Sequence, residues 1–422
     1  MNMSVGIDIV RVDRIENILD KKRNLFLSKI FTINEIKYIK EKNNSPQTIA
    51  GLFSAKESIS KAIGTGIGKV SFKDIEISHD RFGKPIVTIN EKVKSFGISK
   101  IDLAITHEKE YAVSFAEVEF NSNKNAVNIP EELKGLLTKR NPDSHKGDYG
   151  KVLIIGGSRG MTGSITLSSK ASMRTGSGLV YTMVPEYLET IMSIKLTEEI
   201  VKIAKDNGKG YFIKEALEDI LNNAKGKDAL AIGPGMGTYK DNIYLLGEII
   251  KNTNVPMVID ADELNALSKD IDMLKNKKNS IVITPHPGEM ARLLDKSIKE
   301  IESNRIYYAK YISNKYDIVT VLKGNNTIVS YKDQVYINNS GNPGMAKAGS
   351  GDVLTGIITS LIGQGLEPFN AAKLAVYIHG LAGDFAKDKK GEYSMVASDI
   401  IENIGEAINF LLTNKKFSSK LN

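Results

Sequence analysis

The chain has 422 residues, of which 41% are hydrophobic and 25% charged, with a net charge of +7 and no cysteine. This is an ordinary globular composition, and the length allows two hydrophobic cores. The absence of cysteine excludes disulfides, thiolate nucleophiles and cysteine-ligated metals. The first residues show no basic stretch followed by an apolar one, and no apolar run is long enough for a membrane span, so we expect a soluble cytoplasmic protein.

Lysine and arginine are mostly interspersed with acidic residues, as on a solvated surface, and no nucleic-acid-binding motif is present. The local exception is residues 11–42, where basic residues outnumber acidic ones. One interpretation is an exposed helix face, and the other is a docking surface for an acidic partner protein.

The first part of the chain is predicted to be α+β, with a domain over residues 1–119. VGIDIV, residues 5–10, is typical of a short buried strand. SPQTIAGLFSAKESISKAIG predicts a helix that begins after Pro46 and ends at Gly64. DIEISHDRFGKPIVTI and KIDLAITHEKEYAVSFAEVEF each predict two strands around a turn.

Residues 120–127, within the polar stretch EFNSNKNAVN, are predicted to form a linker to a second domain over 128–422. Apolar runs then alternate with helical patterns, as in GKVLIIGGS, DALAIGPGMG, PMVIDAD, KNSIVITPHPGEM and DIVTVLKGNNTIV. This alternation indicates an α/β domain with a mostly parallel sheet covered on both faces. Ligands of such folds bind beyond the carboxyl ends of the strands, where this sequence places glycines, Asp260, His286 and Lys323.

A first group of candidate functional residues comprises Asp8, Glu57 and Lys61. Glu57 and Lys61 share a helix face, and one interpretation is a helical salt bridge. Asp8 lies in an apolar strand, where a carboxylate requires a partner or a metal ion. Two carboxylates suit Mg²⁺, which keeps much of its hydration, and Lys61 with the nearby glycines suits phosphate oxygens.

The ordered motifs GIDIVxxxRI, FT-x-x-E, LFSAKESISKAIGTGIG, DIEI-x-x-D-x-x-GKP and ITHEKEYA resemble holo-acyl-carrier-protein synthase, a 4′-phosphopantetheinyl transferase. The resemblance implies that Asp8 and Glu57 hold Mg²⁺ against the pyrophosphate of coenzyme A. A serine of apo-acyl carrier protein attacks its β-phosphate. Glu57 and Lys61 are then catalytic. The implied coenzyme A contacts are Lys61, Gly64, Gly66 and His107, and the implied docking residues for the acidic carrier protein are Arg14, Lys21, Lys22 and Arg23.

A second group lies in AGSGDVLTG, residues 348–356, where small residues surround Asp352 and a helical run follows. A helix N-terminus with flanking glycines presents N–H donors to an anion, although an acid there can also be a simple N-cap. KGNNT, residues 323–327, is a second turn suited to phosphate. Together they favour phosphoryl transfer, with the carboxylate accepting a hydroxyl proton.

The motifs HKGDYGKVLIIGGSRGMTGS, GPGMG, DADELNAL, ITPHPGEMARLL, LKGNNT and NPGMAKAGSGDVLTG resemble the ribokinase-like ADP/ATP-dependent NAD(P)H-hydrate dehydratase. The resemblance implies that ADP or ATP phosphorylates the ring hydroxyl of the S-form hydrate, NADHX or NADPHX. Phosphate then leaves to restore NADH or NADPH. Asp352 is the implied base. The implied nucleotide contacts are Lys323, Gly324, Asn325, Asn326, Thr327 and Gly351, and the implied hydrate contacts are Gly235, His286, Asp352 and Ile165.

GSIT, residues 163–166, departs from the usual Gly-Ala-Ala of that family, because Ser164 and Ile165 are bulkier. The two resemblances together predict a bifunctional transferase and lyase that forms homo-oligomers. Two alternatives stay open: the second domain as a vitamin-precursor kinase of the same superfamily, and the first as a non-catalytic module that docks a carrier protein.

Overall fold

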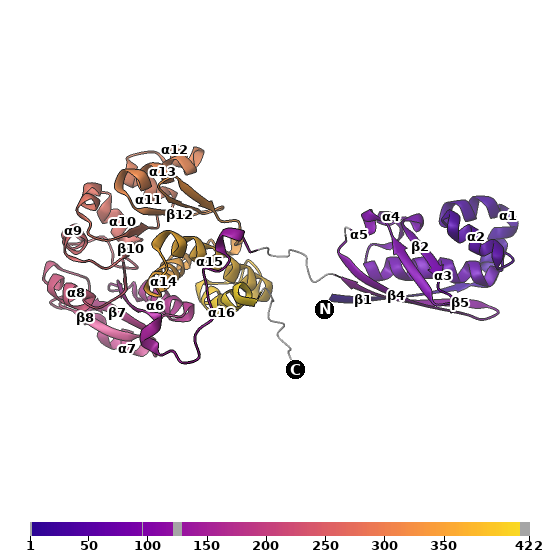
Figure 1. Ribbon diagram of the computed structural model, residues 1–422, viewed down its shortest axis with the longest axis horizontal. Coiled ribbons are helices and arrows are strands. Elements are labelled where there is room, and N and C mark those ends of the chain that lie inside the picture. The colour runs from indigo at the N-terminus through magenta and orange to yellow at the C-terminus, as the bar shows by residue number, and fades with distance from the viewer. Residues whose placement is uncertain (1, 95, 121–128, 414–422) are drawn as a thin grey trace. The chain divides into compact units, whose positions relative to one another are not determined.

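The computed structural model describes residues 2–94, 96–120 and 129–413, and the chain divides into two compact units, 1–128 and 129–422 (Figure 1). The predicted linker, residues 120–127, lies outside the described residues except for Phe120, which ends a strand. None of the helices in the described ranges is long and apolar enough to cross a membrane.

The first unit is α+β, as the sequence predicts. The prediction of a short buried strand at VGIDIV is wrong, because β1 has ten residues and exposes Val5, Ile7 and Ile9 on one face. Three strands form an antiparallel sheet in the order β1-β5-β4, and β2 pairs with β3 in a separate hairpin. The elements are β1 (Asn2–Arg11), α1 (Val12–Ile30), α2 (Ile33–Glu41), α3 (Pro46–Ile63), α4 (Gly66–Lys69), β2 (Ile75–His79), β3 (Pro85–Ile89), α5 (Glu91–Lys94), β4 (Ile98–His107) and β5 (Tyr111–Phe120).

Helix α3 is specified at both ends by its sequence. The Ser45 hydroxyl accepts the Thr48 N–H, Pro46 occupies the first turn, and Gly64 ends the helix with φ +80°. The helix packs closely on β1 at Gly6, where a Cβ would lie 2.0 Å from the carbonyl oxygen of Ser58. Only glycine permits this approach, which brings one face of α3 against the strand that carries Asp8.

A buried ion pair ties α3 to the rest of the first unit. Lys56 and Glu35 have fully buried side chains, and Lys56 Nζ lies 2.8 Å from Glu35 Oε2. Lys56 also donates to the carbonyl of Phe72 at 2.7 Å, while Glu35 Oε1 accepts the N–H of Ile77 at 2.8 Å. The pair therefore joins α2, α3 and β2, and each charge has polar partners within the core.

The second unit is a nine-stranded sheet in the order β14-β13-β12-β11-β10-β9-β6-β7-β8. Strands β8 to β12, together with β6 and β7, run parallel, and β13 and β14 are antiparallel additions at one edge. The strands are β6 (Lys151–Ile155), β7 (Leu179–Pro185), β8 (Ile200–Ala204), β9 (Ala229–Ile232), β10 (Met257–Ile259), β11 (Ile281–Ile283), β12 (Val319–Leu322), β13 (Ile328–Tyr331) and β14 (Gln334–Ile337).

Helices cover both faces of this sheet, which explains its uninterrupted apolar strands. Val152 of β6 faces Gly363 at the end of α14, while Leu153 packs into the core on the opposite face. The helices are α6 (Thr162–Thr175), α7 (Glu189–Lys195), α8 (Leu217–Ala224), α9 (Asn242–Asn252), α10 (Asp262–Leu267), α11 (Pro287–Leu294), α12 (Ile298–Ser303), α13 (Arg305–Tyr316), α14 (Ser350–Gly363), α15 (Pro368–Lys390) and α16 (Ala397–Thr413).

We predict that breaking the Lys56–Glu35 pair destabilises the first unit. Lys56→Met leaves a buried carboxylate without its cation and should cost about 3–5 kcal/mol. Adding Glu35→Gln removes that unpaired charge, so the double variant should be less destabilised than the sum of the single changes. Hydrogen exchange of peptides from residues 46–63, followed by mass spectrometry, measures the effect on α3.

The matched control is Lys94→Met, which breaks an exposed pair with Glu91 and should change stability by less than about 1 kcal/mol. Equal exchange in Lys56→Met and Lys94→Met would contradict the role given to the buried pair.

Candidate functional sites

The close packing of α3 on β1 brings Asp8, Glu57 and Lys61 together. Lys61 Nζ lies 2.8 Å from Asp8 Oδ1 and 3.2 Å from the carbonyl oxygen of Ile7. Within the described ranges, no ion pair joins Glu57 to Lys61. Instead of the helical salt bridge considered in the sequence analysis, Lys61 of α3 pairs with Asp8 of β1. Burial, and then the charge of Asp8, raises the pKa of Glu57.

The donor set of this first site fits a divalent ion. Asp8 Oδ2 is buried without a hydrogen-bond partner, although Oδ1 of the same carboxylate binds Lys61. Glu57 is half-buried, and its repulsion from Asp8 would be relieved by a bound cation. No cluster of three or more His, Asp or Glu suited to a metal occurs in the described part of the chain. Two carboxylates suit Mg²⁺, which completes its shell with water and phosphate oxygens.

The other residues predicted for the first site lie on exposed segments. Gly64 and Gly66 follow α3 with φ +80° and +62°, and space is open beside both. His107, at the end of β4, is exposed. The predicted docking residues Arg14, Lys21, Lys22 and Arg23 are all exposed on α1, and three of them line a groove of about 580 Å³.

In the second unit, a fully buried carboxylate organises the carboxyl edge of the sheet. Asp260, just after β10, is 1% exposed, and its Oδ1 lies 2.8 Å from Lys323 Nζ. Its Oδ2 accepts the Thr355 hydroxyl at 2.5 Å, and Lys323 is also 3.8 Å from Glu289 Oε2. Burial alone would raise the pKa of Asp260, but the Lys323 ammonium and these hydrogen bonds outweigh it and lower that pKa.

Asp352 lies in the first turn of α14, where helix N–H groups have no intrahelical acceptor. Its backbone carbonyl accepts the Ser168 hydroxyl at 2.9 Å, which fixes the helix start. Burial, and then the charge of Asp260, raises the pKa of Asp352 to about 7, although Ser164 and Lys323 act in the opposite direction. The carboxylate is only half-buried, so a substrate can reach it. Because its pKa is raised to about 7, it can accept a proton at neutral pH.

Lys323 also lies against the glycine that precedes Asp352, since a Cβ on Gly351 would be 3.3 Å from Lys323 Nζ. The rest of the KGNNT turn connects β12 to β13, and Gly324, Asn325 and Asn326 are exposed. The Thr327 hydroxyl donates to the carbonyl of Gly324 at 2.9 Å. The turn thus presents backbone groups to solvent beside the Lys323 ammonium, whose side chain is 18% exposed.

Arg305, at the start of α13, holds the KGNNT turn in place. Its guanidinium donates to the carbonyls of Leu322 and Lys323, both at 3.2 Å, and to that of Asn325. Sequence reasoning missed this residue, because nothing in its neighbourhood signals a contact with a turn almost twenty positions later.

His286 caps α11 and reaches the same edge of the sheet. Its Nδ1 accepts the N–H groups of Gly288 at 3.0 Å and Glu289 at 3.3 Å. Burial, and then the Lys323 charge, lowers the pKa of His286, which favours the neutral imidazole. The side chain is half exposed.

Gly235 adopts φ +65°, and a Cβ there would lie 2.6 Å from the carbonyl oxygen of Met161. Ile165 is fully buried beneath Gly156 and Gly157, so its side chain is closed to a ligand and the predicted hydrate contact could involve only its backbone. The neighbouring Ser164 faces Asp352 instead, and was noted in the sequence only as a departure.

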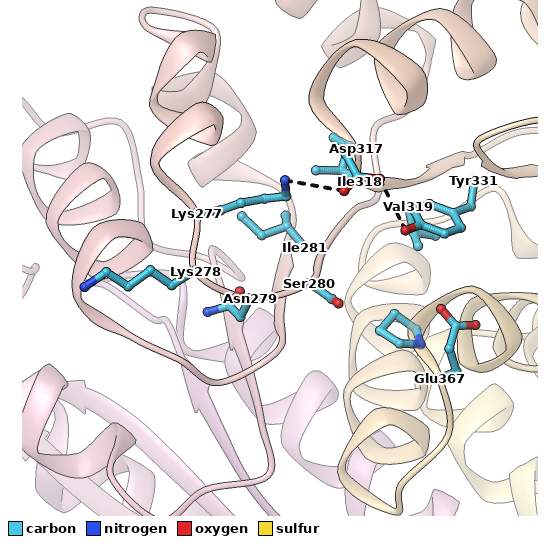
Figure 2. Close-up of a pocket in the computed structure, with 11 residues that line it drawn as sticks. Lys277, Lys278, Asn279, Ser280, Ile281, Asp317, Ile318, Val319, Tyr331 and Glu367 are labelled. Atoms are coloured by element: carbon cyan, nitrogen blue, oxygen red, sulfur yellow. Dashed lines mark hydrogen bonds and ion pairs between the residues drawn. The ribbon is translucent and has the colours of Figure 1, made fainter.

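A pocket of about 330 Å³ lies at the opposite end of the strands, at their amino ends (Figure 2). It opens beside the amino ends of β11 and β12, where Lys277 and Tyr331 both approach Asp317, Tyr331 through a 3.2 Å hydrogen bond. The sequence placed no candidate residue there, and the pocket is separated from Asp352 by the length of the strands.

Comparison with known proteins identifies both units. Residues 152–406 match the family model of NAD(P)H-hydrate dehydratase, and residues 4–116 match that of the 4′-phosphopantetheinyl transferase superfamily.

The chain is 44% identical over 270 residues to the bifunctional NAD(P)H-hydrate repair enzyme of Moorella thermoacetica, covering 64% of this chain and 51% of that protein. It is 35% identical over 271 residues to the ADP-dependent (S)-NAD(P)H-hydrate dehydratase of Neisseria meningitidis, covering 63% and 86%. The chain thus spans about half the length of the bifunctional relative that it matches.

Among solved structures, the ADP/ATP-dependent NAD(P)H-hydrate dehydratase of Bacillus subtilis, co-crystallised with ATP and Mg²⁺, is similar, with a TM-score of 0.58 and 26% identity. The alignment covers 68% of this chain and 99% of that one.

We predict that Asp352 titrates near neutral pH and that Asp260 contributes to this. Asp260→Asn removes a negative charge that raises the pKa of Asp352 and frees Lys323 to act on it, so the pKa should fall. Carboxyl ¹³C NMR of protein labelled on aspartate measures the titration, with Asp352→Asn identifying the resonance. The exposed Asp333 supplies the control variant Asp333→Asn, which should leave the curve unchanged. Titration of wild-type Asp352 near pH 4 would contradict the assignment.

Proposed function

The chain belongs to the NAD(P)H-hydrate dehydratase family through residues 152–406, and from this premise we propose that its second unit dehydrates the S-form of NADHX or NADPHX at the expense of ADP or ATP. The observation that carries the proposal is Asp352, a half-buried carboxylate with a pKa of about 7 in the first turn of α14, beside Lys323.

The proposed reaction begins with the ring hydroxyl of the hydrate. Asp352 accepts its proton while the oxygen bonds to the terminal phosphorus of the nucleotide, whose bond to the bridging oxygen breaks. The N–H groups of the first turn of α14 and the Lys323 ammonium lie where they stabilise charge on the phosphoryl oxygens. The C–O bond of the phosphorylated ring then breaks, phosphate leaves with the bond electrons, and loss of a ring proton restores the reduced nicotinamide.

For the first unit, we propose transfer of 4′-phosphopantetheine from coenzyme A to a serine of apo-acyl carrier protein. The support is the grouping of Asp8, Glu57 and Lys61, with a buried carboxylate oxygen that lacks a partner, in a segment that matches the transferase superfamily. Asp8 and Glu57 would hold Mg²⁺, which supplies charge neutralisation to the pyrophosphate, and Lys61 contacts the phosphates. This catalytic grouping favours a transferase over a module that only docks.

The carrier protein that we propose is acidic, because α1 presents a basic surface. Arg14, Lys21, Lys22 and Arg23 are exposed on one helix, and the groove beside them also contains the apolar Ile18. Complementary charge of this kind raises association rates and selects partners.

We also propose that the chain forms homo-oligomers through the outer face of the β1-β5-β4 sheet. Successive outward residues of β1 are apolar and more than half exposed: Met3 53%, Val5 58%, Ile7 59% and Ile9 62%. Tyr111 and Phe115 of β5 extend this face, since they pair with Arg11 and Ile7 in the register. An exposed apolar sheet face of this extent is typical of an association surface.

The vitamin-precursor kinase alternative shares the base and the anion site, so the product decides between them. A kinase would release a phosphorylated substrate, whereas the dehydratase releases phosphate and restores the nicotinamide absorbance.

We predict that Asp352→Asn lowers the rate of NADHX dehydration by at least about 100-fold, because the general base is lost. The base acts as its carboxylate, so kcat/KM of the wild type should fall as the pH drops below about 7 and should level off above it. The recovery of nicotinamide absorbance with ADP or ATP measures the rate. Asp333→Asn serves as the exposed control, and wild-type enzyme that restores no NADH would disprove the dehydratase proposal.

We predict that the two activities are separable. Asp8→Ala should abolish the mass increase of apo-carrier protein incubated with coenzyme A and Mg²⁺, and should leave NADHX dehydration intact. Asp352→Asn should do the reverse, because the two sites lie in different units. Glu91→Gln, at an exposed carboxylate, is the control for transfer. Loss of both activities in one folded variant would exclude the two-site proposal.

A further inference from the structure

Aromatic and basic side chains gather in loops at the carboxyl edge of the sheet, beyond the proposed catalytic group. Tyr211 follows β8 and Tyr239 follows β9, and their rings stack with centroids 3.8 Å apart and planes 6° apart. Both rings are half-buried. The Lys209 ammonium lies 5.9 Å from the Tyr211 centroid. None of the roles proposed above uses this pair.

The tyrosine pair is connected to the reacting carboxylate through close contacts. Ser164, which interacts with that carboxylate, has its Cβ 3.1 Å from where a Cβ on Gly235 would lie. A Cβ on Gly237 would lie 3.2 Å from Met161 Cε and 2.5 Å from Tyr239 Cε2. Both glycines are buried, and a run of close contacts through Ser164, Gly235, Met161 and Gly237 connects the reacting carboxylate to Tyr239.

The loop that carries Lys209 is preformed. Asp206 is 1% exposed, and its carboxylate accepts the N–H groups of Gly208 at 2.9 Å and Gly210 at 2.8 Å. The carbonyl of Gly210 in turn accepts the Arg159 N–H at 2.7 Å. Lys209 and Arg159 are both exposed. Lys209 lies over Tyr211, while the Arg159 guanidinium lies 5.2 Å from the centroid of the neighbouring Tyr187 ring, so a ligand would order these cations at little cost.

We propose that Tyr211, Tyr239 and Lys209 form a subsite for the adenosine half of the hydrated dinucleotide. This subsite rests on the proposed dehydratase function: the adenine lies against the tyrosine pair, and a phosphate lies beside Lys209 and Arg159. Aromatic stacking accepts any base through its π-face, and a nearby cation supplies the charge that a phosphate needs.

The place of the subsite along the sheet separates it from the KGNNT turn. Tyr211 follows β8 and Tyr239 follows β9, and both strands lie on one side of β10. KGNNT follows β12, on the other side of β10. The phosphoryl donor and the dinucleotide would thus approach Asp352 from opposite sides of the sheet edge.

The test compares two substrates, the hydrates of NADH and of reduced nicotinamide mononucleotide, which lacks the adenosine half. Tyr239→Leu should lower kcat/KM for the dinucleotide hydrate about tenfold and leave the mononucleotide hydrate unchanged, while Tyr239→Phe should resemble the wild type. Lys209→Gln, at an exposed side chain, should lower kcat/KM for the dinucleotide hydrate and weaken its salt dependence. Tyr311→Ala removes an exposed tyrosine on α13 and is the control.

An equal loss on both substrates, or no loss on either, overturns the subsite. Absence of turnover by the wild type would instead refute the proposed dehydratase function. In that event, calorimetric titration of ADP-ribose in saturating ADP decides the inference. Weaker binding to Tyr239→Leu and to Lys209→Gln than to the wild type supports the subsite, and equal binding overturns it.

Discussion

The buried carboxylate of Asp260 is the interaction on which the second site depends. Through Lys323 and Thr355 it joins the end of β10 to the end of β12 and to α14. Thr355 lies one turn beyond Asp352, so the bond that anchors the helix also sets where the reacting carboxylate stands. Such a pair is expensive to desolvate, and its retention at a sheet edge is understandable where it fixes three segments at once.

The charges around this pair follow a consistent pattern. Burial raises the pKa values of Glu289 and Asp352 and lowers those of His286 and His379, in the last case to about 4. Each of these groups is thereby pushed toward its neutral form, while Asp260 and Lys323 stay charged. A phosphate at the first turn of α14 would therefore lie near the charged Lys323 ammonium, while Glu289 and Asp352 are shifted toward their uncharged forms and repel it less.

Much of this architecture is readable from the sequence, and the exceptions have physical causes. The uninterrupted apolar strands predicted the covered sheet, and the α+β pattern of the first unit is confirmed. LVYTMVP and IVKIA were not recognised as β7 and β8, because Thr182 interrupts the apolar run of β7 and Lys202 that of the edge strand β8. The short turn KGNNT between two apolar runs is typical of antiparallel strands, but it was assigned to phosphate binding, so the antiparallel β13 and β14 were not predicted.

Among the site residues, chemistry and spacing selected Asp8, Glu57 and Lys61, which the fold brings together, while their catalytic roles stay predictions. That Lys61 pairs with Asp8 could not be read from the sequence, because it depends on how closely α3 approaches β1 at Gly6. Arg305 and Asp206 escaped notice for a related reason. Each acts on the backbone of a loop, a contact that leaves no mark in residue type or spacing.

In the first site, the Lys61 ammonium neutralises the Asp8 carboxylate while no metal ion is bound. A divalent cation that binds Asp8 must compete with the Lys61 ammonium. Because Lys61 belongs to the same chain, its effective concentration at Asp8 does not depend on the protein concentration. Stray ions would therefore gain little there, whereas an ion that arrives together with pyrophosphate gives Lys61 a new anion to bind. The Asp8 carboxylate would therefore stay paired with Lys61 until substrate and metal ion bind together.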